Sequence, residues 1–162
     1  MVIHVDSREQ KNKHILDHFN EVGQDYIVSK AISGDYIDVN NNDVIIDLKQ
    51  SHGDGLAELC ANLTKTTEHI RLKKELERAK FIGCKRFIFL IVSTKITCLE
   101  DVNKWVNKRG QVAPETLQKI MTTFKDRYKV EYIFCKKKVA GERIIELLSK
   151  ETGDQDGKSK QT

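Results

Sequence analysis

The stretch SGDYIDVNNNDVIIDLKQS, Ser33 to Ser51, predicts two strands joined by a tight turn. The strands are expected at Asp35–Val39 and Asp43–Lys49, on either side of three asparagines. Asparagine tolerates the left-handed backbone angles that turns require. An antiparallel hairpin of this kind brings the first residue of one strand next to the last residues of the other.

The end of this hairpin carries acidic and basic side chains instead of ordinary turn residues. Because side chains alternate between the faces of a strand, Asp47 and Lys49 share one face, and the hairpin brings Asp35 close to Asp47. Two close carboxylates repel each other unless a cation lies between them, and hard oxygen ligands suit Mg²⁺ or Mn²⁺. Such an ion polarises a phosphoryl oxygen and lowers the pKa of a bound water, while Lys49 offsets charge that develops on a phosphate. The stretch therefore predicts a Mg²⁺ or Mn²⁺ site with Asp35 and Asp47 as ligands.

Strands and helices alternate along the rest of the chain. This alternation predicts an α/β fold, a three-layer sandwich with a mixed β-sheet flanked by helices. The run Arg86–Val92 is apolar throughout, which is typical of a strand covered on both faces. Other strands are expected at Val2–Val5, Tyr26–Ala31 and Val130–Cys135, and helices at Lys11–Val22, Gly55–Ala79 (as one helix or two), Leu99–Val106, Pro114–Arg127 and Val139–Lys150.

Length and composition predict one globular domain. The chain has 162 residues, of which 39% are hydrophobic and 32% are charged, with a net charge of +4 that permits nucleic-acid binding. We expect a domain at 1–150 and a disordered tail at 151–162, where no large apolar residue occurs. No apolar run is long enough for a membrane span, and the N-terminus lacks the features of a signal peptide. The four cysteines have no C-x-x-C spacing, so we expect reduced thiols.

Three segments in this order resemble a known nuclease family. They are VDSRE (Val5–Glu9), GDY (Gly34–Tyr36) and IIDLKQS (Ile45–Ser51), and the similarity runs from residue 2 to residue 92. Together they resemble the XPF-type nuclease domain of the PD-(D/E)XK superfamily, closest to short stand-alone versions from phages and prophages. The resemblance implies a restriction-endonuclease-like core and a metal-dependent endonuclease that hydrolyses phosphodiester bonds in branched or structured DNA.

The resemblance also implies roles for particular residues. Asp6 joins Asp35 and Asp47 as a metal ligand, in a site that holds Mg²⁺ or Mn²⁺. The implied catalytic residues are Asp35, Asp47, Lys49, Asp6 and Glu9, and the implied DNA-binding residues are Arg8, His69 and Arg71. DNA and a second copy of the chain are the implied partners. The implied location is the cytoplasm of a bacterial or phage-infected cell.

The sequence departs from the family pattern at three places. Asp47 stands where the family has glutamate, and Leu48 stands where it has arginine. The later acid of the family falls at Gly53, with Asp54 one place further on.

Several structural alternatives stay open on the sequence alone. Asp47 and Lys49 could form an exposed ion pair, and Asp6 to Glu9 could cap the N-terminus of a helix. Arg71, Glu75 and Arg78 could form a salt-bridged helix surface. The basic run at 136–138 is a solvated surface in most proteins, although lysines near a site raise its affinity for phosphate.

Other functions also stay open. A Holliday junction resolvase or a restriction-type nuclease of the same superfamily would use the same residues. A DNA-binding module that keeps the fold without cutting is a further alternative.

Overall fold

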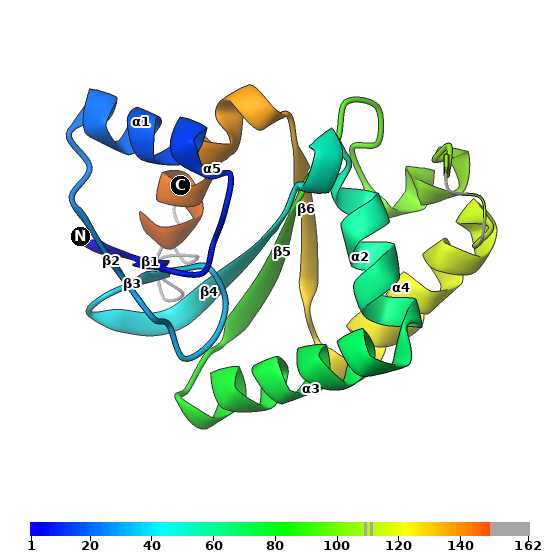
Figure 1. The fold of residues 1–162 in the computed structure, drawn as a ribbon. Coiled ribbons are helices and arrows are strands. Elements are labelled where there is room, and N and C mark those ends of the chain that lie inside the picture. The colour runs from blue at the N-terminus through cyan, green and yellow to red at the C-terminus, as the bar shows by residue number, and fades with distance from the viewer. Residues whose placement is uncertain (109, 111, 150–162) are drawn as a thin grey trace, which may run out of the picture.

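The computed structural model describes residues 1–108, 110 and 112–149, and the tail expected at 151–162 lies outside this part of the chain. Six strands form one sheet in the order β2-β1-β3-β4-β5-β6 (Figure 1). The neighbouring pairs β1–β2, β4–β5 and β5–β6 are parallel, while β1–β3 and β3–β4 are antiparallel. The strands are β1 (Ile3–Asp6), β2 (Tyr26–Ser29), β3 (Tyr36–Asp38), β4 (Asn41–Lys49), β5 (Arg86–Val92) and β6 (Glu131–Cys135).

Helices cover both faces of this sheet. One face carries α1 and α5, and the other carries α2, α3 and α4, as Figure 1 shows. The α-helices are α1 (Lys13–Val22), α2 (Gly55–Thr64), α3 (Thr66–Phe81), α4 (Pro114–Tyr128) and α5 (Ala140–Ser149), and the 3₁₀ turns are η1 (Ser51–Gly53), η2 (Leu99–Lys104) and η3 (Lys137–Val139). The predicted α/β three-layer sandwich with a mixed sheet is confirmed.

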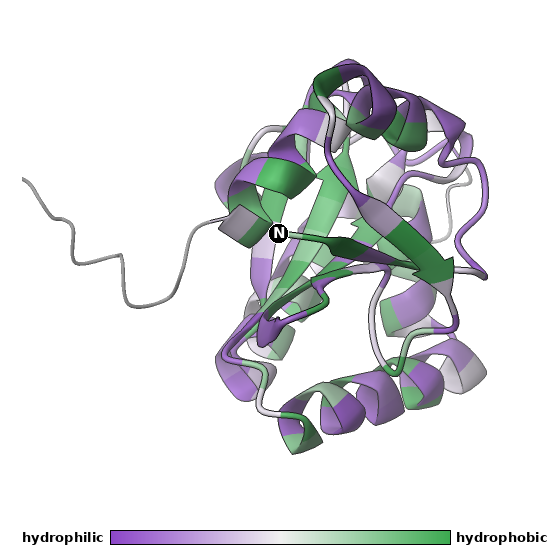
Figure 2. Cartoon of the chain, turned by 90° about the vertical axis from the view of Figure 1, so that its left-hand side faces the viewer, coloured by the Kyte–Doolittle hydropathy of each residue, from purple (hydrophilic) through white to green (hydrophobic). Residues whose placement is uncertain are grey.

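Strand alternation divides the apolar residues between two cores. In β5, Phe87, Phe89 and Ile91 pack toward α2, α3 and α4, while the residues between them pack toward α1 and α5. Burying a large apolar side chain stabilises a fold by about 1.5–3 kcal/mol, so a strand buried on both faces anchors both layers. In Figure 2 the strands are mostly apolar, and the outer faces of the helices are largely polar.

The hairpin that carries the acidic residues has a shorter turn than predicted. Asn41 and Asn42 belong to β4, so that only Val39 and Asn40 form the turn, and the expected three-asparagine turn is wrong. The Asp38 side chain accepts a hydrogen bond from the Asn40 N–H at 3.0 Å, and it thereby satisfies a backbone donor inside the turn. The pairing register also shifts next to this turn, between Ile37 and Asp38.

Three further expectations are settled by the helix boundaries. The helical region after β4 consists of two helices, because Lys65 adopts an extended backbone at φ −85° and ψ 128°. The alternative that Asp6 to Glu9 cap a helix is wrong, since α1 begins at Lys13 after Asn12. The segment expected as a helix up to Val106 is a 3₁₀ turn that ends at Lys104.

The four cysteines carry free thiols, as predicted. None of the helices formed by the described residues combines the length and the apolar character that a bilayer crossing requires.

Candidate active site

The end of β4 places an acid and a base side by side inside the protein. Asp47 and Lys49 are only 5% and 6% exposed, so the alternative of an exposed ion pair is wrong. Lys49 Nζ lies 3.2 Å from Asp47 Oδ2 and 5.7 Å from the centre of the Phe89 ring. Both side chains point to the face of the sheet that α2 and α3 cover, because they share the parity of Ile45 in that core.

Asp35 lies opposite Asp47 across the hairpin. The β3–β4 register pairs Tyr36 with Ile46, and continuing it by one residue pairs Asp35 with Asp47. Asp35 Oδ2 accepts a hydrogen bond from the Leu48 N–H at 2.7 Å, which holds the carboxyl against β4. Burial, the charges of Asp47 and Glu9, and a hydrogen bond with Asp47 together raise the pKa of Asp35 well above its usual range. The predicted closeness of the two carboxyls is therefore present.

Gly34 makes this approach possible. Its φ of +69° lies in the left-handed region, where glycine has no steric penalty. A side-chain carbon at this position would overlap the Ile45 side chain and lie 3.1 Å from the Ile46 carbonyl oxygen. The Gly34 N–H donates to Glu75 Oε2 at 2.8 Å, so the same residue ties the loop before β3 to α3.

Glu9 approaches the carboxyl pair from the segment that follows β1. Its Oε2 is buried and has no hydrogen-bond partner among the described residues. Burial, followed by the charges of Asp47 and Glu58, raises the pKa of Glu9 to about 8. Glu9 thus lies buried near Asp47 and Glu58.

Three further acids line the same cleft, Glu58 of α2 and Glu68 and Glu75 of α3, and none of them was predicted for the site from the sequence. Glu58 Oε1 accepts hydrogen bonds from the backbone N–H groups of Gln50 at 2.9 Å and Ser51 at 3.0 Å. Burial and the charge of Asp47 raise the pKa of Glu75 to about 7. One signal was available for Glu58, because it is the only charged residue within the otherwise uncharged segment of α2.

Lys49 is the cation at the centre of these acids. Burial lowers the pKa of Lys49, but the carboxyls of Asp47, Glu58 and other acids of the site outweigh it, so the pKa lies above its ordinary value. Lys49 Nζ lies 3.9 Å from Glu58 Oε2, in addition to its contact with Asp47. Lys49 is consequently protonated throughout the neutral range.

Asp6 lies in the cleft, but its carboxylate already has partners. Both of its oxygens are 3.2 Å from Arg8 Nε, and Oδ1 also accepts from the Ala31 N–H at 3.0 Å. Arg8 in turn donates to the Ala31 carbonyl oxygen at 2.9 Å. The structure therefore places Asp6 where it orients Arg8, and a direct contact with a metal ion would have to compete with these bonds.

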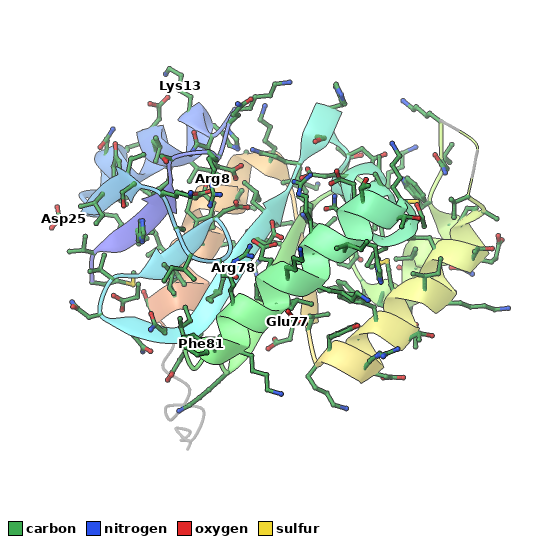
Figure 3. All side chains as sticks on the ribbon, turned by 60° about the horizontal axis from the view of Figure 1, so that its bottom comes forward. Arg8, Lys13, Asp25, Glu77, Arg78 and Phe81 are labelled. Atoms are coloured by element: carbon green, nitrogen blue, oxygen red, sulfur yellow. The ribbon has the colours of Figure 1, made fainter. Side chains whose placement is uncertain are left out.

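The cleft has a volume of about 540 Å³, and cationic side chains form part of its wall. Arg71 and Lys74 approach from α3 with Arg78, whose Nε donates to the Ile32 carbonyl oxygen at 2.8 Å. Arg8 approaches from the segment after β1, and Figure 3 shows Arg8 and Arg78 on the same side of the molecule. The lining residues are Asp6, Arg8, Glu9, Ile32, Ser33, Gly34, Asp35, Asp47, Leu48, Lys49, Glu58, Asn62, Glu68, Arg71, Leu72, Lys74, Glu75 and Arg78.

Two residues considered in the sequence analysis lie outside this cleft. His69 packs edge-on against Phe124 of α4 at 5.9 Å between ring centres, so the structure does not bring it to the predicted site. Asp54 is the N-cap of α2, and its side chain accepts hydrogen bonds from the Ala57 N–H at 3.4 Å and from Trp105 Nε1 at 3.1 Å. Asp54 therefore does not take the place of the later family acid in the cleft.

Arg71, Glu75 and Arg78 do not form the salt-bridged α3 surface that was one alternative from the sequence. Arg71 pairs with Glu68 at 2.8 Å, one turn earlier on the same helix. Glu75 instead bonds to Gly34, and Arg78 bonds to a backbone carbonyl group. All three residues line the cleft, and Glu75 and Arg78 hold the loop before β3.

The acidic residues fit a divalent ion with hard oxygen ligands. Asp35 and Asp47 are paired across the β3–β4 hairpin and line the same cleft, and Glu9 lines it as well. Within residues 1–108, 110 and 112–149, no three His, Cys, Asp or Glu side chains form a complete metal site. Mg²⁺ commonly takes only one or two carboxylates and fills its other positions with waters and substrate phosphates. A facing carboxylate pair is sufficient for an ion of that kind.

The crowded carboxyls predict an unusual pH dependence of stability. Glu75 and Glu9, with pKa values of about 7 and about 8 in the folded protein, hold protons that the unfolded chain loses near 4.5. Since the folded state then binds more protons, the free energy of unfolding falls as the pH rises between these values. One pKa unit corresponds to about 1.4 kcal/mol, so we expect a loss of several kcal/mol between about pH 5 and pH 8.

This loss is measured by urea unfolding in a chelator at both pH values. The same titration with Mg²⁺ is expected to show a smaller loss, because a bound cation compensates the ionised carboxyls. In Glu9→Gln the loss in chelator is also expected to be smaller. Equal stability at the two pH values in chelator would contradict the prediction.

Comparisons with known proteins agree with this architecture. The ERCC4 domain model matches residues 5–148. The solved structure of XPF from Aeropyrum pernix has a TM-score of 0.65 at 15% identity, covering 91% of this chain and 63% of its own. The structure titled XPF from Aeropyrum pernix, complex with DNA, has a TM-score of 0.57 at 14% identity, covering 90% of this chain and 64% of its own.

This chain therefore spans less than two thirds of the length of either solved structure. No curated protein sequence matches it. The family match covers most of the chain, and it includes all the acidic residues placed in the cleft. The chain therefore belongs to the ERCC4 domain family, the family of the XPF-type nuclease domains.

Proposed function

We propose that this protein is a metal-dependent endonuclease that hydrolyses phosphodiester bonds in DNA. The observation that carries the proposal is that Asp35 faces Asp47 across the β3–β4 hairpin in one cleft, with the Lys49 ammonium 3.2 Å from Asp47. A site built to hold a stable ion pair would need only one of these acids. A divalent ion between the two acids explains the second one, because its charge offsets the repulsion between the carboxylates.

Each group has a distinct part in this proposal. Asp35 and Asp47 would hold Mg²⁺ or Mn²⁺, and such an ion supplies a water of lowered pKa and polarises a phosphoryl oxygen. Lys49, which stays protonated, stabilises the negative charge that develops on the phosphate in the transition state. Burial among carboxyls strengthens this contribution, because few water molecules screen the charges.

The cationic wall supports a DNA substrate. Arg8, Arg71, Lys74 and Arg78 surround the acids, and a phosphate backbone is the polyanion that such a wall attracts. A neighbouring XPF structure was solved in complex with DNA, which supports the same substrate for this chain. Preference for branched or structured DNA, and pairing of two copies, are further parts of the proposal that the family membership supports.

The proposal is tested with a panel of labelled DNA substrates: linear duplex, flap, fork and four-way junction. We expect cleavage with Mg²⁺ or Mn²⁺, none with chelator, and faster cleavage of a branched substrate than of linear duplex. Symmetric paired nicks at the junction would favour a resolvase, and sequence-specific cuts in duplex would favour a restriction-type enzyme. Binding without turnover in either metal would contradict the proposal and favour a non-cutting module.

Two variants show whether the observed cleavage is catalysed by the candidate site of this protein. Asp35→Asn keeps the volume of the side chain and removes its charge, so cleavage should be lost. Asp25→Asn makes the same chemical change at an exposed residue that does not line the cleft, and Figure 3 shows Asp25 at the periphery of the molecule. Cleavage that survives in Asp35→Asn would come from a contaminating nuclease or a different site.

A further inference from the structure

A second cleft of about 510 Å³ adjoins the candidate active site. The two clefts share Arg8, Glu9, Leu48 and Glu58, so they adjoin along these side chains, and we call the two clefts together the trough. The lining residues of the second cleft are Arg8, Glu9, Gln10, Lys11, Leu48, Gln50, Ser51, His52, Gly53, Glu58 and Lys137. The carboxyls at the end of β4 thus lie between the α3 side of the trough and this second cleft.

The charges of the second cleft are unevenly distributed. Among the described residues that line it, the acids are Glu9 and Glu58, which are shared with the active site and mark the border between the two clefts. Beyond this border its charged side chains are Lys11 and Lys137, both exposed, among polar side chains. The acidic centre of the trough therefore has cations on both sides, those of α3 on one and this pair of lysines on the other.

The walls of the second cleft are held in place by contacts with the active site. Glu58 accepts from the backbone of Gln50 and Ser51, and the Gln50 side chain donates to the Lys11 carbonyl oxygen at 3.2 Å. Lys11 and His52 have left-handed backbones, with φ of 59° and 55°. Such conformations cost free energy in residues other than glycine, and they are enriched at functional sites.

We propose that one DNA strand runs through both clefts, with the scissile phosphate at Asp35 and Asp47 and the following phosphates at Lys11 and Lys137. This inference rests on the proposed function and adds the path of the strand. A strand carries phosphates in both directions from the cut, so cations on both sides of the acids match its charge pattern. A trough that continues past the site in both directions also admits an internal phosphodiester, which favours endonucleolytic over end-trimming cleavage.

The basic run at 136–138 provides matched controls for this path. Lys137 lines the second cleft, while Lys136 and Lys138 are also exposed but do not line it. We would measure DNA affinity by fluorescence anisotropy in the Asp47→Asn background, over about 50–200 mM salt. Lys137→Ala is expected to weaken binding about threefold to tenfold and to reduce the salt slope by about one, as for the loss of one phosphate contact.

Lys136→Ala and Lys138→Ala are expected to change the affinity less than about twofold, because they remove charge outside the trough. Equal losses in all three variants would indicate general electrostatic attraction and overturn the inference. An unchanged affinity in Lys137→Ala would overturn it as well. This binding test decides the path of the strand even if no substrate is cleaved.

Lys11→Gly separates binding from stability. Glycine adopts a φ near 59° without steric cost, so the melting temperature should be unchanged or higher while DNA affinity falls as in Lys137→Ala. Unchanged affinity in this variant would remove Lys11 from the path.

Cleavage assays distinguish a failed path from a failed function. If the unmodified protein cuts DNA and Lys137→Ala cuts equally well at limiting substrate, the path is wrong and the nuclease function stands. If the path is right, a substrate shortened on the side of the cut that occupies the second cleft has no phosphate at Lys137, so Lys137→Ala no longer affects its cleavage. A substrate shortened on the other side keeps that phosphate, so the effect of Lys137→Ala persists. The proposed function itself fails only if the unmodified protein cuts none of the substrates.

Discussion

Replacing Asp47 by asparagine is expected to lower the rate of DNA cleavage by at least about 10³-fold. Substituting a residue that only hydrogen-bonds to a metal ligand typically costs roughly 10- to 100-fold, so a larger loss indicates a ligand. Asparagine has the same shape but lacks the charge that a divalent ion requires. The substitution removes no apolar volume from either core, so the fold is retained. Single-turnover cleavage rates, with both the protein and Mg²⁺ in saturating excess, measure the effect without a contribution from DNA binding.

The same substitution is expected to raise the stability of the metal-free protein. The charge of Asp47 contributes to the raised pKa values of Asp35, Glu9 and Glu75, so its removal relieves repulsion at three positions. Lys49 keeps other acidic neighbours, including Glu58. Urea unfolding in chelator at about pH 8 should show the gain, because these carboxyls are most ionised there. Retained cleavage, or a large loss of stability, would refute the role assigned to Asp47.

Gly34→Ala is expected to destabilise the protein by about 2–4 kcal/mol. A left-handed backbone costs a residue other than glycine about 1 kcal/mol or more, and overpacking a core typically costs about 1–3 kcal/mol. Both costs apply here, because φ is +69° and the added carbon would overlap the Ile45 side chain. Because Asp35 is the next residue, relaxation of the backbone would also displace a proposed metal ligand, and cleavage should fall together with stability.

Gly23→Ala is the matched control for this prediction. Gly23 has a similar φ of +74°, but no atom lies within 4 Å of the position of an added carbon. It should therefore show the backbone cost alone, about 1 kcal/mol, and leave cleavage unchanged. Equal melting temperatures for the two variants would mean that the contact with Ile45 relaxes freely, which would contradict the assigned role of Gly34.

Local backbone geometry made much of the site predictable from the sequence. The alternation of side chains along a strand has a period of two residues, and it correctly placed Ile45, Asp47 and Lys49 on one face. Antiparallel pairing similarly predicted the approach of Asp35, although the turn proved to be shorter. An error of one or two residues in the turn did not move the acids, because the apolar residues of both strands fix the register against two cores.

The contributions from the helices were not predictable in this way. Glu58, Glu75 and His69 all lie on helices of the same layer, but only the two acids reach the cleft. Which side of a helix faces a strand end depends on how the helix crosses the sheet, and residues far apart in the sequence decide that crossing. The basic run at 136–138 illustrates the same limit, because three adjacent lysines look equivalent until the fold places only Lys137 in a cleft.

The sequence by itself determined the sheet, the hairpin and the pair of facing acids, since each depends on the two-residue repeat of a strand and on apolar residues that must be buried. Only the tertiary structure decided that Glu75 bonds to Gly34, that Asp6 orients Arg8, and that a second cleft continues past the acids. These features depend on segments that are far apart in the sequence, and the repeat of side chains within one strand or helix does not predict them. They form only when the layers pack and bring the loops and helix faces together at the C-terminal end of β4.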